Sequence, residues 1–309
     1  MKNLGRLFAV LLLALCLPFT APLLADEGGQ EPAATYSLPS ARVADFSSIL
    51  AARSDEVTLY EYGGRSAILI LDFPSLAEQG RMFNRVGALV ERLGAPRGRV
   101  MSNEELAGFI RSVGKTEATF AYGNDFMVSE LVVFFNLADL GGVRLNAEEI
   151  ALRQLLLDRR LLVMRRGFYQ AVSPRAVILS IPQETGDRSF TPRVSALARQ
   201  TILMHEISHA EFYTNRLYAA YCRKFWKTVL SEEQRAAFRK FLSGSSYDAN
   251  NEEMMINETQ AYLLYTPDPR AFNARLVGMK DKEVELLRER FWAGFPDAPL
   301  AELRRPASL

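Results

Sequence analysis

The sequence predicts an α+β protein, with a mixed α/β N-terminal half that contains a small sheet and a mainly helical C-terminal half. Two observations predict this class. Apolar runs of strand length alternate with helical spacing as far as Pro182, whereas nearly every later segment has the spacing and capping residues of a helix. The 309 residues, 49% hydrophobic and 24% charged, exclude a fibrous or wholly disordered chain.

Residues 1–25 have the pattern of a cleaved secretory signal. Lys2 and Arg6 precede an apolar run over residues 7–17, and the small residue Ala25 stands before an acidic stretch. This run is shorter than the roughly 20 residues that a membrane-spanning helix needs. We therefore expect a secreted or periplasmic protein, cleaved near Ala25, with no stable membrane span; an uncleaved anchor is the alternative.

The chain has two cysteines, Cys16 and Cys222. Leu15 stands where lipoprotein processing requires a small residue, so we do not expect a lipoprotein. Signal cleavage would leave Cys222 as the single cysteine, which excludes an intramolecular disulfide. We interpret Cys222 as a small apolar residue of a helix.

The N-terminal half consists of an expected flexible lead-in over residues 26–40 and an α+β part over residues 41–190. Residues 57–62 and 67–73 predict a strand pair joined by a tight turn at Gly63-Gly64. Helical spacing follows over residues 75–93 and ends at Gly94. Ser102 and Asn146, each followed by two glutamates, predict the starts of two more helices, and we interpret the apolar runs 131–135 and 176–181 as strands.

Residues 191–309 form the helical part, which either stands alone or continues the preceding part as one catalytic domain. Thr191-Pro192 predicts the start of the helix that carries both histidines. Further helices are expected over residues 216–230, from the capping box of Ser231 and Gln234, and from Asn250 or Asn251 to about Tyr265. A loop over residues 243–250 separates the last two.

The charges nearly cancel, with 37 Lys and Arg against 36 Asp and Glu. The chain therefore has no net positive field that would attract nucleic acid or an anionic membrane. We do not expect a nucleic-acid partner.

The only two histidines form the motif H-E-x-x-H as His205, Glu206 and His209. Residues four apart lie one turn above each other on a helix, so the two imidazoles can bind one metal ion. Glu206, about 100° further round the helix, can reach a water molecule on that ion without being a ligand.

The alternative is that both histidines are core residues with ordinary hydrogen bonds. Apolar residues surround this helix on nearly all sides, so a charged Glu206 would be costly there without a nearby cation or donor. This cost favours a metal.

A catalytic zinc site normally has three protein ligands and one open position. No third histidine exists, and Phe212 and Asn215 stand where the metzincin pattern requires Gly and His, so the third donor is a carboxylate or Cys222. Glu258 lies in the middle of an apolar stripe of its helix, where a charge needs a partner. Asp248 is the reserve ligand, and the alternative for Glu258 is a buried ion pair or a hydrogen bond to a tyrosine.

The motif His205-Glu206-x-x-His209, with Asn257-Glu258 on a later helix, resembles the gluzincin branch of the zincin metallopeptidases. The resemblance covers about 75 residues, and no specific family within the branch is identified. It implies a zincin-like fold, one Zn²⁺ per chain, Glu258 as third ligand, and Glu206 as the general base that activates a zinc-bound water and passes its proton to the leaving amine. It also implies a peptide substrate that binds as an added strand on a sheet edge, for which residues 176–181 are the candidate; an interior strand is the alternative.

A group that stabilises the oxyanion should accompany the metal. Tyr262, Tyr265, Tyr213 and Tyr247 are candidates because they stand near the ligands in the sequence. Tyr262, one turn after Glu258, equally suits the orientation of a ligand.

We therefore expect a zinc-dependent metallopeptidase that hydrolyses amide bonds of a peptide or protein substrate. The alternatives are a non-catalytic cell-envelope protein with a structural zinc or polar core site, and a peptidoglycan-directed zinc amidase. A structural site would be closed by four protein ligands.

Overall fold

A five-stranded mixed sheet lies at the centre of the chain, in the computed structural model that describes residues 36–185, 192–245 and 247–303. Its strand order is β1-β2-β3-β7-β4, where β1 pairs parallel with β2, β3 pairs parallel with β7, and the other two pairs are antiparallel. The strands are β1 (Arg42–Ala44), β2 (Thr58–Tyr62), β3 (Ile68–Phe73), β7 (Val177–Pro182) and β4 (Asn124–Met127). The expected α+β class is confirmed, with a helical C-terminal half.

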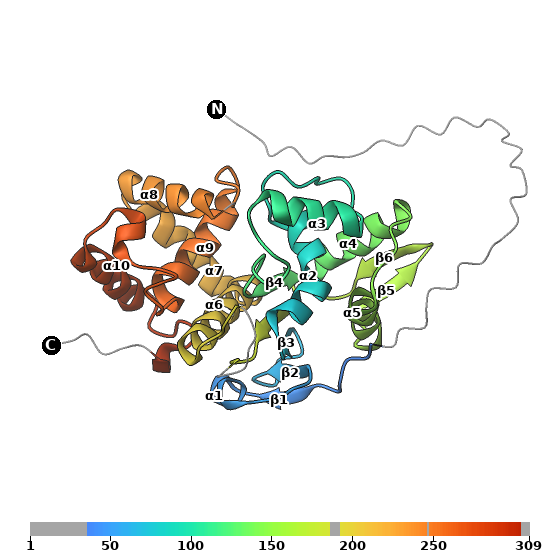
Figure 1. The fold of residues 1–309 in the computed structure, drawn as a ribbon. Coiled ribbons are helices and arrows are strands. Elements are labelled where there is room, and N and C mark those ends of the chain that lie inside the picture. The colour runs from blue at the N-terminus through green and yellow to red at the C-terminus, as the bar shows by residue number, and fades with distance from the viewer. Residues whose placement is uncertain (1–35, 186–191, 246, 304–309) are drawn as a thin grey trace, which may run out of the picture. The chain divides into compact units, whose positions relative to one another are not determined.

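Helices cover both faces of this sheet, because the central strands are apolar on both sides. Along β3, Ile68 and Ile70 enter the core formed with the C-terminal helices, whereas Leu69 and Leu71 enter the core on the opposite face. This alternation follows the two-residue period of a strand. Figure 1 shows the two groups of helices on opposite sides of the sheet.

One face is covered by helices of the N-terminal half, and a separate β5-β6 hairpin lies beside them. Ser102 and Asn146 cap two of these helices as predicted, in capping boxes with Glu105 and Glu149. Ser75 caps a third, the helix expected from the spacing over residues 75–93. The elements are α2 (Leu76–Val90), α3 (Asn103–Ser112), α4 (Val128–Leu140), α5 (Ala147–Asp158), β5 (Leu162–Arg165) and β6 (Phe168–Ala171).

The prediction of a strand over residues 131–135 is wrong, because this run lies inside α4. The buried residues Val128, Leu131, Phe135 and Ala138 recur at helical spacing, and the Glu130 carboxylate accepts from the Met127 N–H at the helix start. A short apolar run is compatible with either element, and here the packing of α4 against β4 and β6 decides.

The other face is covered by α1 and the C-terminal helices. α6 begins at Ala196, where the Ser195 hydroxyl accepts from the Ala198 N–H, rather than at Thr191-Pro192; Thr191 itself lies outside the described residues. The elements are α1 (Phe46–Ala51), α6 (Ala196–Thr214), α7 (Arg216–Thr228), α8 (Glu232–Gly244), α9 (Glu252–Tyr265), η1 (Ala274–Val277), α10 (Asp281–Gly294) and η2 (Ala301–Leu303).

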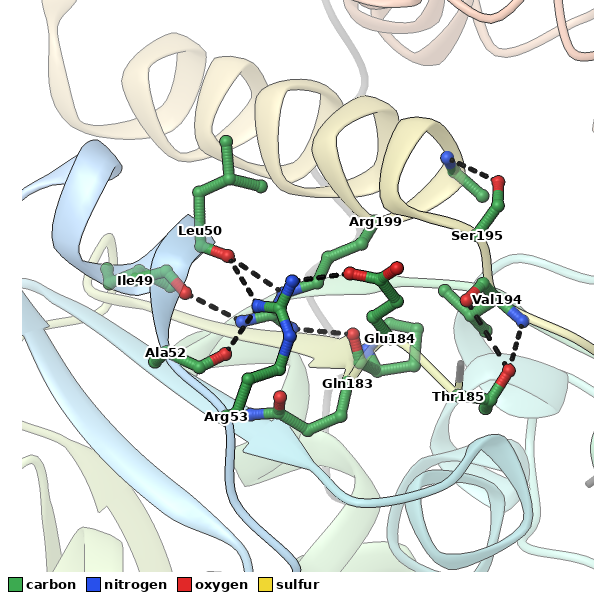
Figure 2. A network of polar contacts seen from close by, with 12 residues as sticks. Ile49, Leu50, Ala52, Arg53, Gln183, Glu184, Thr185, Val194, Ser195 and Arg199 are labelled. Atoms are coloured by element: carbon green, nitrogen blue, oxygen red, sulfur yellow. Dashed lines mark hydrogen bonds and ion pairs between the residues drawn. The ribbon is translucent and has the colours of Figure 1, made fainter. Parts of the chain in front are cut away.

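A buried ion pair joins the start of α6 to the sheet. The Arg199 guanidinium donates twice to Asp72 on β3, at 2.8 Å each, and both side chains are fully buried. Figure 2 shows Arg199 also donating to carbonyl oxygens at the end of α1, including that of Ile49. These contacts place α6 against the centre of the sheet.

The expected signal segment, residues 1–25, lies outside the described residues, and so do residues 26–35 of the expected lead-in. Residues 36–40 have no regular secondary structure, although the Tyr36 hydroxyl donates to Glu78 of α2. No helix among residues 36–303, where described, combines the length and the apolarity that crossing a bilayer requires. Residues 36–303, as far as they are described, belong to one compact unit.

Candidate metal centre

The two histidines project together from α6. Their ring centroids are 4.6 Å apart, with the ring planes at 81°. His209 is almost fully buried, and the His205 side chain is 13% exposed. The four-residue spacing therefore places the two rings side by side, as the sequence predicts.

α9 brings Glu258 to the same point. The helix begins after Asn251, whose side chain accepts from the Met254 N–H, and packs along α6. Glu258 Oε2 lies 3.6 Å from His205 Nε2, and Glu258 Oε1 lies 3.7 Å from His209 Nε2.

These separations are too long for hydrogen bonds. Two ligands of one tetrahedral zinc ion, each bonded at about 2.0–2.1 Å, lie roughly 3.3 Å apart. Glu258 Oε2 is buried and has no hydrogen-bond partner, which is unusual for a buried polar atom and is consistent with a role as a metal ligand. His205, His209 and Glu258 thus fit a metal ion.

The remaining ring nitrogen of each histidine is held by an acceptor. His205 Nδ1 lies 3.0 Å from the Thr266 hydroxyl, which itself donates to the Ala261 carbonyl and so must accept from the ring. His209 Nδ1 lies 2.9 Å from Asn257 Oδ1. With the protons on Nδ1, both Nε2 lone pairs face Glu258, the arrangement that metal ligation requires.

Glu206 lies beside the three donors and belongs to a second group, with Asp125 of β4 and His209, whose donor atoms lie within 4.8 Å of one another. The Glu206 side chain is pressed against the backbone just before β4. A Cβ atom on Gly123 would lie 2.1 Å from Glu206 Oε1. Only glycine at position 123 permits this approach.

Several buried carboxylates share this region and raise one another's pKa values. Burial raises the pKa of Glu206 well above its usual range, and the nearby charge of Glu258 raises it further. Burial followed by repulsion from Glu206 does the same to the pKa of Asp125. Burial also raises the pKa of Glu258 and lowers that of each histidine to about 4. A bound cation would stabilise the ionised form of these buried carboxylates, and neutral imidazoles are the form that binds a metal ion.

The four tyrosines occupy different positions. The Tyr262 ring packs edge-on against His205, with centroids 4.8 Å apart. The Tyr247 hydroxyl lies near enough to Glu258 to lower the pKa of that carboxyl, against the larger effect of burial. Tyr213 is half-buried one turn after His209, and repulsion from Asp125 adds to burial in raising its pKa. The Tyr265 hydroxyl lies 3.3 Å from the Tyr218 hydroxyl of α7.

Asp248, the reserve ligand, does not join the histidines. Its carboxylate accepts from the backbone and the amide of Asn250 in the loop before α9. Cys222 is buried in α7 and is not paired, which agrees with its interpretation as a small apolar residue.

The sequence did not indicate Asp125, Gly123 or Thr266 as site residues. Gly123-Asn124-Asp125 has the composition of a turn, whereas residues 124–127 form the edge strand β4. Residues 176–181 were the candidate edge strand for binding a peptide substrate. Of these, residues 177–181 lie instead in β7, an interior strand between β3 and β4, which was the alternative. The run 176–181 is apolar on both faces, which is typical of an interior strand.

A cavity of about 600 Å³ lies at the C-terminal end of α6, between the β2–β3 turn and the start of α7. It is lined by residues 64–68 and 214–217 and by none of the three metal donors. Its polar lining includes Arg65 and Arg216.

The comparisons with known proteins return no relative. No protein-family description, curated protein or solved structure matches the chain. The functional argument therefore rests on the residues themselves.

Proposed function

We propose that the protein is a zinc-dependent hydrolase that cleaves amide bonds of a peptide or protein substrate. The observation that carries this proposal is the convergence of His205 Nε2, His209 Nε2 and Glu258, at 3.6 and 3.7 Å, with both Nδ1 atoms held by acceptors. The described part of the chain supplies three donors at this point, and a three-donor set leaves a position open for chemistry, whereas a structural site uses four. This count favours an enzyme over a structural zinc site.

His205, His209 and Glu258 would hold the metal. A bound zinc ion would supply Lewis acidity and lower the pKa of a water molecule to about 7. Glu206 then accepts the proton of the attacking water and delivers it to the nitrogen of the leaving amine. Burial beside Glu258 raises the pKa of Glu206, which makes its carboxylate a stronger base and keeps the accepted proton on it until the second step.

The edge strand β4 is the proposed binding place of the substrate backbone. β4 pairs with β7 on one side and lies at the edge of the sheet, and the Glu206 side chain lies against the residue just before it. An extended peptide can add to such an edge through backbone hydrogen bonds. A secreted or periplasmic location, indicated by residues 1–25, fits a protein or peptide substrate outside the cytosol.

The test uses protein purified with a tag that contains no histidine, so that His205 and His209 are the only imidazoles present. Zinc content by atomic absorption should be about one per chain and should be lost in His205→Ala and His209→Ala. Glu206→Gln should keep the zinc and lose hydrolysis of a protein or quenched-peptide panel, because it cannot accept the proton.

Glu211→Gln is the matched control on the same helix, because Glu211 pairs with Arg65 away from the metal donors. It should keep both zinc and hydrolysis. A protein that binds no zinc at micromolar concentration, or a Glu206→Gln variant as active as the parent, would overturn the proposal. Cleavage of peptidoglycan fragments but not of peptides would assign the same centre to an amidase.

A further inference from the structure

We propose that Gln260 and Tyr218 are positioning residues that fix the tautomer of His209, so that its Nε2 keeps the lone pair facing Glu258. The tautomer follows from hydrogen bonds of the chain alone. Only its consequence for zinc affinity rests on the proposed function.

A continuous chain of buried polar contacts leads from α7 to His209. The Tyr218 hydroxyl donates to Gln260 Oε1 at 2.6 Å. Gln260 Nε2 donates to Asn257 Oδ1 at 3.2 Å, and Asn257 Oδ1 lies 2.9 Å from His209 Nδ1. All four side chains are at most 4% exposed, so water does not compete for these contacts.

The direction of each hydrogen bond is set by Ser208, on α6 beside His209. The Ser208 hydroxyl donates to the His205 carbonyl at 2.7 Å, so its oxygen can only accept from Gln260, 3.2 Å away. Gln260 must therefore turn its NH₂ group toward Ser208 and its carbonyl oxygen toward Tyr218. Tyr218 supplies the proton that this carbonyl accepts.

The same NH₂ group decides the orientation of the next amide. Because Gln260 presents a donor, Asn257 must present Oδ1 to it, and this oxygen also faces His209 Nδ1. The ring nitrogen facing an oxygen acceptor carries the proton, and Nε2 is left free. A reversed Asn257 amide would set its NH₂ group against the NH₂ of Gln260, and the buried hydrogen bond between the two amides would be lost.

His205 is held separately, by Thr266 and the Ala261 carbonyl. The two tautomers can therefore be perturbed one at a time. Gln260 and Tyr218 act on His209, whereas Thr266 acts on His205.

The experiment is nitrogen-15 NMR of the metal-free full chain labelled at histidine, which gives signals from two imidazoles because the chain has two histidines. The spectra are recorded at pH 7.5, above the ordinary pKa of histidine, so that neutral rings are compared. In the parent protein both rings should carry the proton on Nδ1. Gln260→Leu should give His209 a second population with the proton on Nε2, and should leave His205 unchanged.

Two further variants keep the test decisive if Gln260→Leu fails to fold. Tyr218→Phe, which removes one hydroxyl, should shift His209 in the same direction, whereas Thr266→Val should shift His205 alone. Tyr221→Phe is the matched control on α7, because the Tyr221 hydroxyl donates to the Phe291 carbonyl outside this chain of contacts. It should shift neither ring.

Zinc titration gives the second measurement. Gln260→Leu should weaken zinc affinity about 10-fold, as expected when a partner behind a ligating histidine is lost. A His209 ring that stays wholly in the Nδ1–H form in both Gln260→Leu and Tyr218→Phe would overturn the inference. A parent protein with both Nδ1–H tautomers but no zinc affinity would leave the inference standing and refute the proposed function.

Discussion

Gly123→Ala is the substitution for which the structure gives the sharpest expectation. The added Cβ atom would lie 2.1 Å from Glu206 Oε1, 2.7 Å from Cδ and 2.9 Å from Cγ. Ordinary van der Waals contact begins at 3.4 Å, so Oε1 and position 123 must separate by 3.4 minus 2.1, or 1.3 Å. Either the Glu206 carboxylate moves or the start of β4 moves.

A displacement of this size should reduce turnover about 100-fold, because a catalytic group misplaced by about 1 Å loses that much rate. Overpacking should also lower the free energy of unfolding by about 1–3 kcal/mol. Zinc content should stay at that of the parent, since Glu206 is not among the three metal donors.

The assay compares hydrolysis of a peptide that the parent protein cleaves, zinc content, and unfolding in guanidinium chloride. Gly108→Ala is the matched control, because Gly108 lies within α3 and a Cβ there meets no atom within 4 Å. It should keep full activity and gain up to about 1 kcal/mol of stability from the higher helix propensity of alanine. A Gly123→Ala variant with parental turnover and parental stability would refute the close approach of Gly123 to Glu206.

Two further predictions concern stability. Asp72→Asn should lower the free energy of unfolding by about 3–5 kcal/mol in denaturant titrations, because it leaves the buried Arg199 charge without its counter-ion. Glu253→Gln, at an exposed ion pair, should change the free energy of unfolding by less than about 1 kcal/mol. Equal effects of the two substitutions would contradict the role of the buried pair. Burial raises the pKa of Glu130 in the folded protein from 4.5 to about 7. Between pH 4.5 and pH 7 the Glu130 carboxyl therefore loses its proton in the unfolded chain but keeps it in the folded protein. The free energy of unfolding falls over this range, by up to about 3 kcal/mol. Glu130→Gln, which keeps an oxygen to accept from the Met127 N–H, should therefore gain stability over the parent at pH 8 but not at pH 4, measured by thermal unfolding at both values.

The local signals of the sequence determined most of the secondary structure. Ser102, Asn146 and Ser231 each cap a helix as predicted, because a side chain that caps the first turn acts over three residues and needs no tertiary partner. The apolar run 131–135 gave the wrong element, since such a run satisfies either period and its environment decides.

The candidate metal centre also has features that the sequence determined and features that came from tertiary packing. The four-residue spacing of His205 and His209 determined that their rings share a helix face, and the apolar stripe of α9 indicated Glu258, because both features follow from helical geometry. The pairing of α6 with α9 then brought Glu258 to the two rings.

Only the tertiary structure decided which other residues surround this centre. Asp125 and Gly123 come from the edge of the sheet, some 80 residues before Glu206, and no local pattern relates segments so far apart. The hydrogen bonds of Asn257 and Thr266 to the two rings likewise arise from how α9 lies on α6. Sequence periodicity determines which face of a helix is buried, whereas the partner of that face depends on how the whole chain packs.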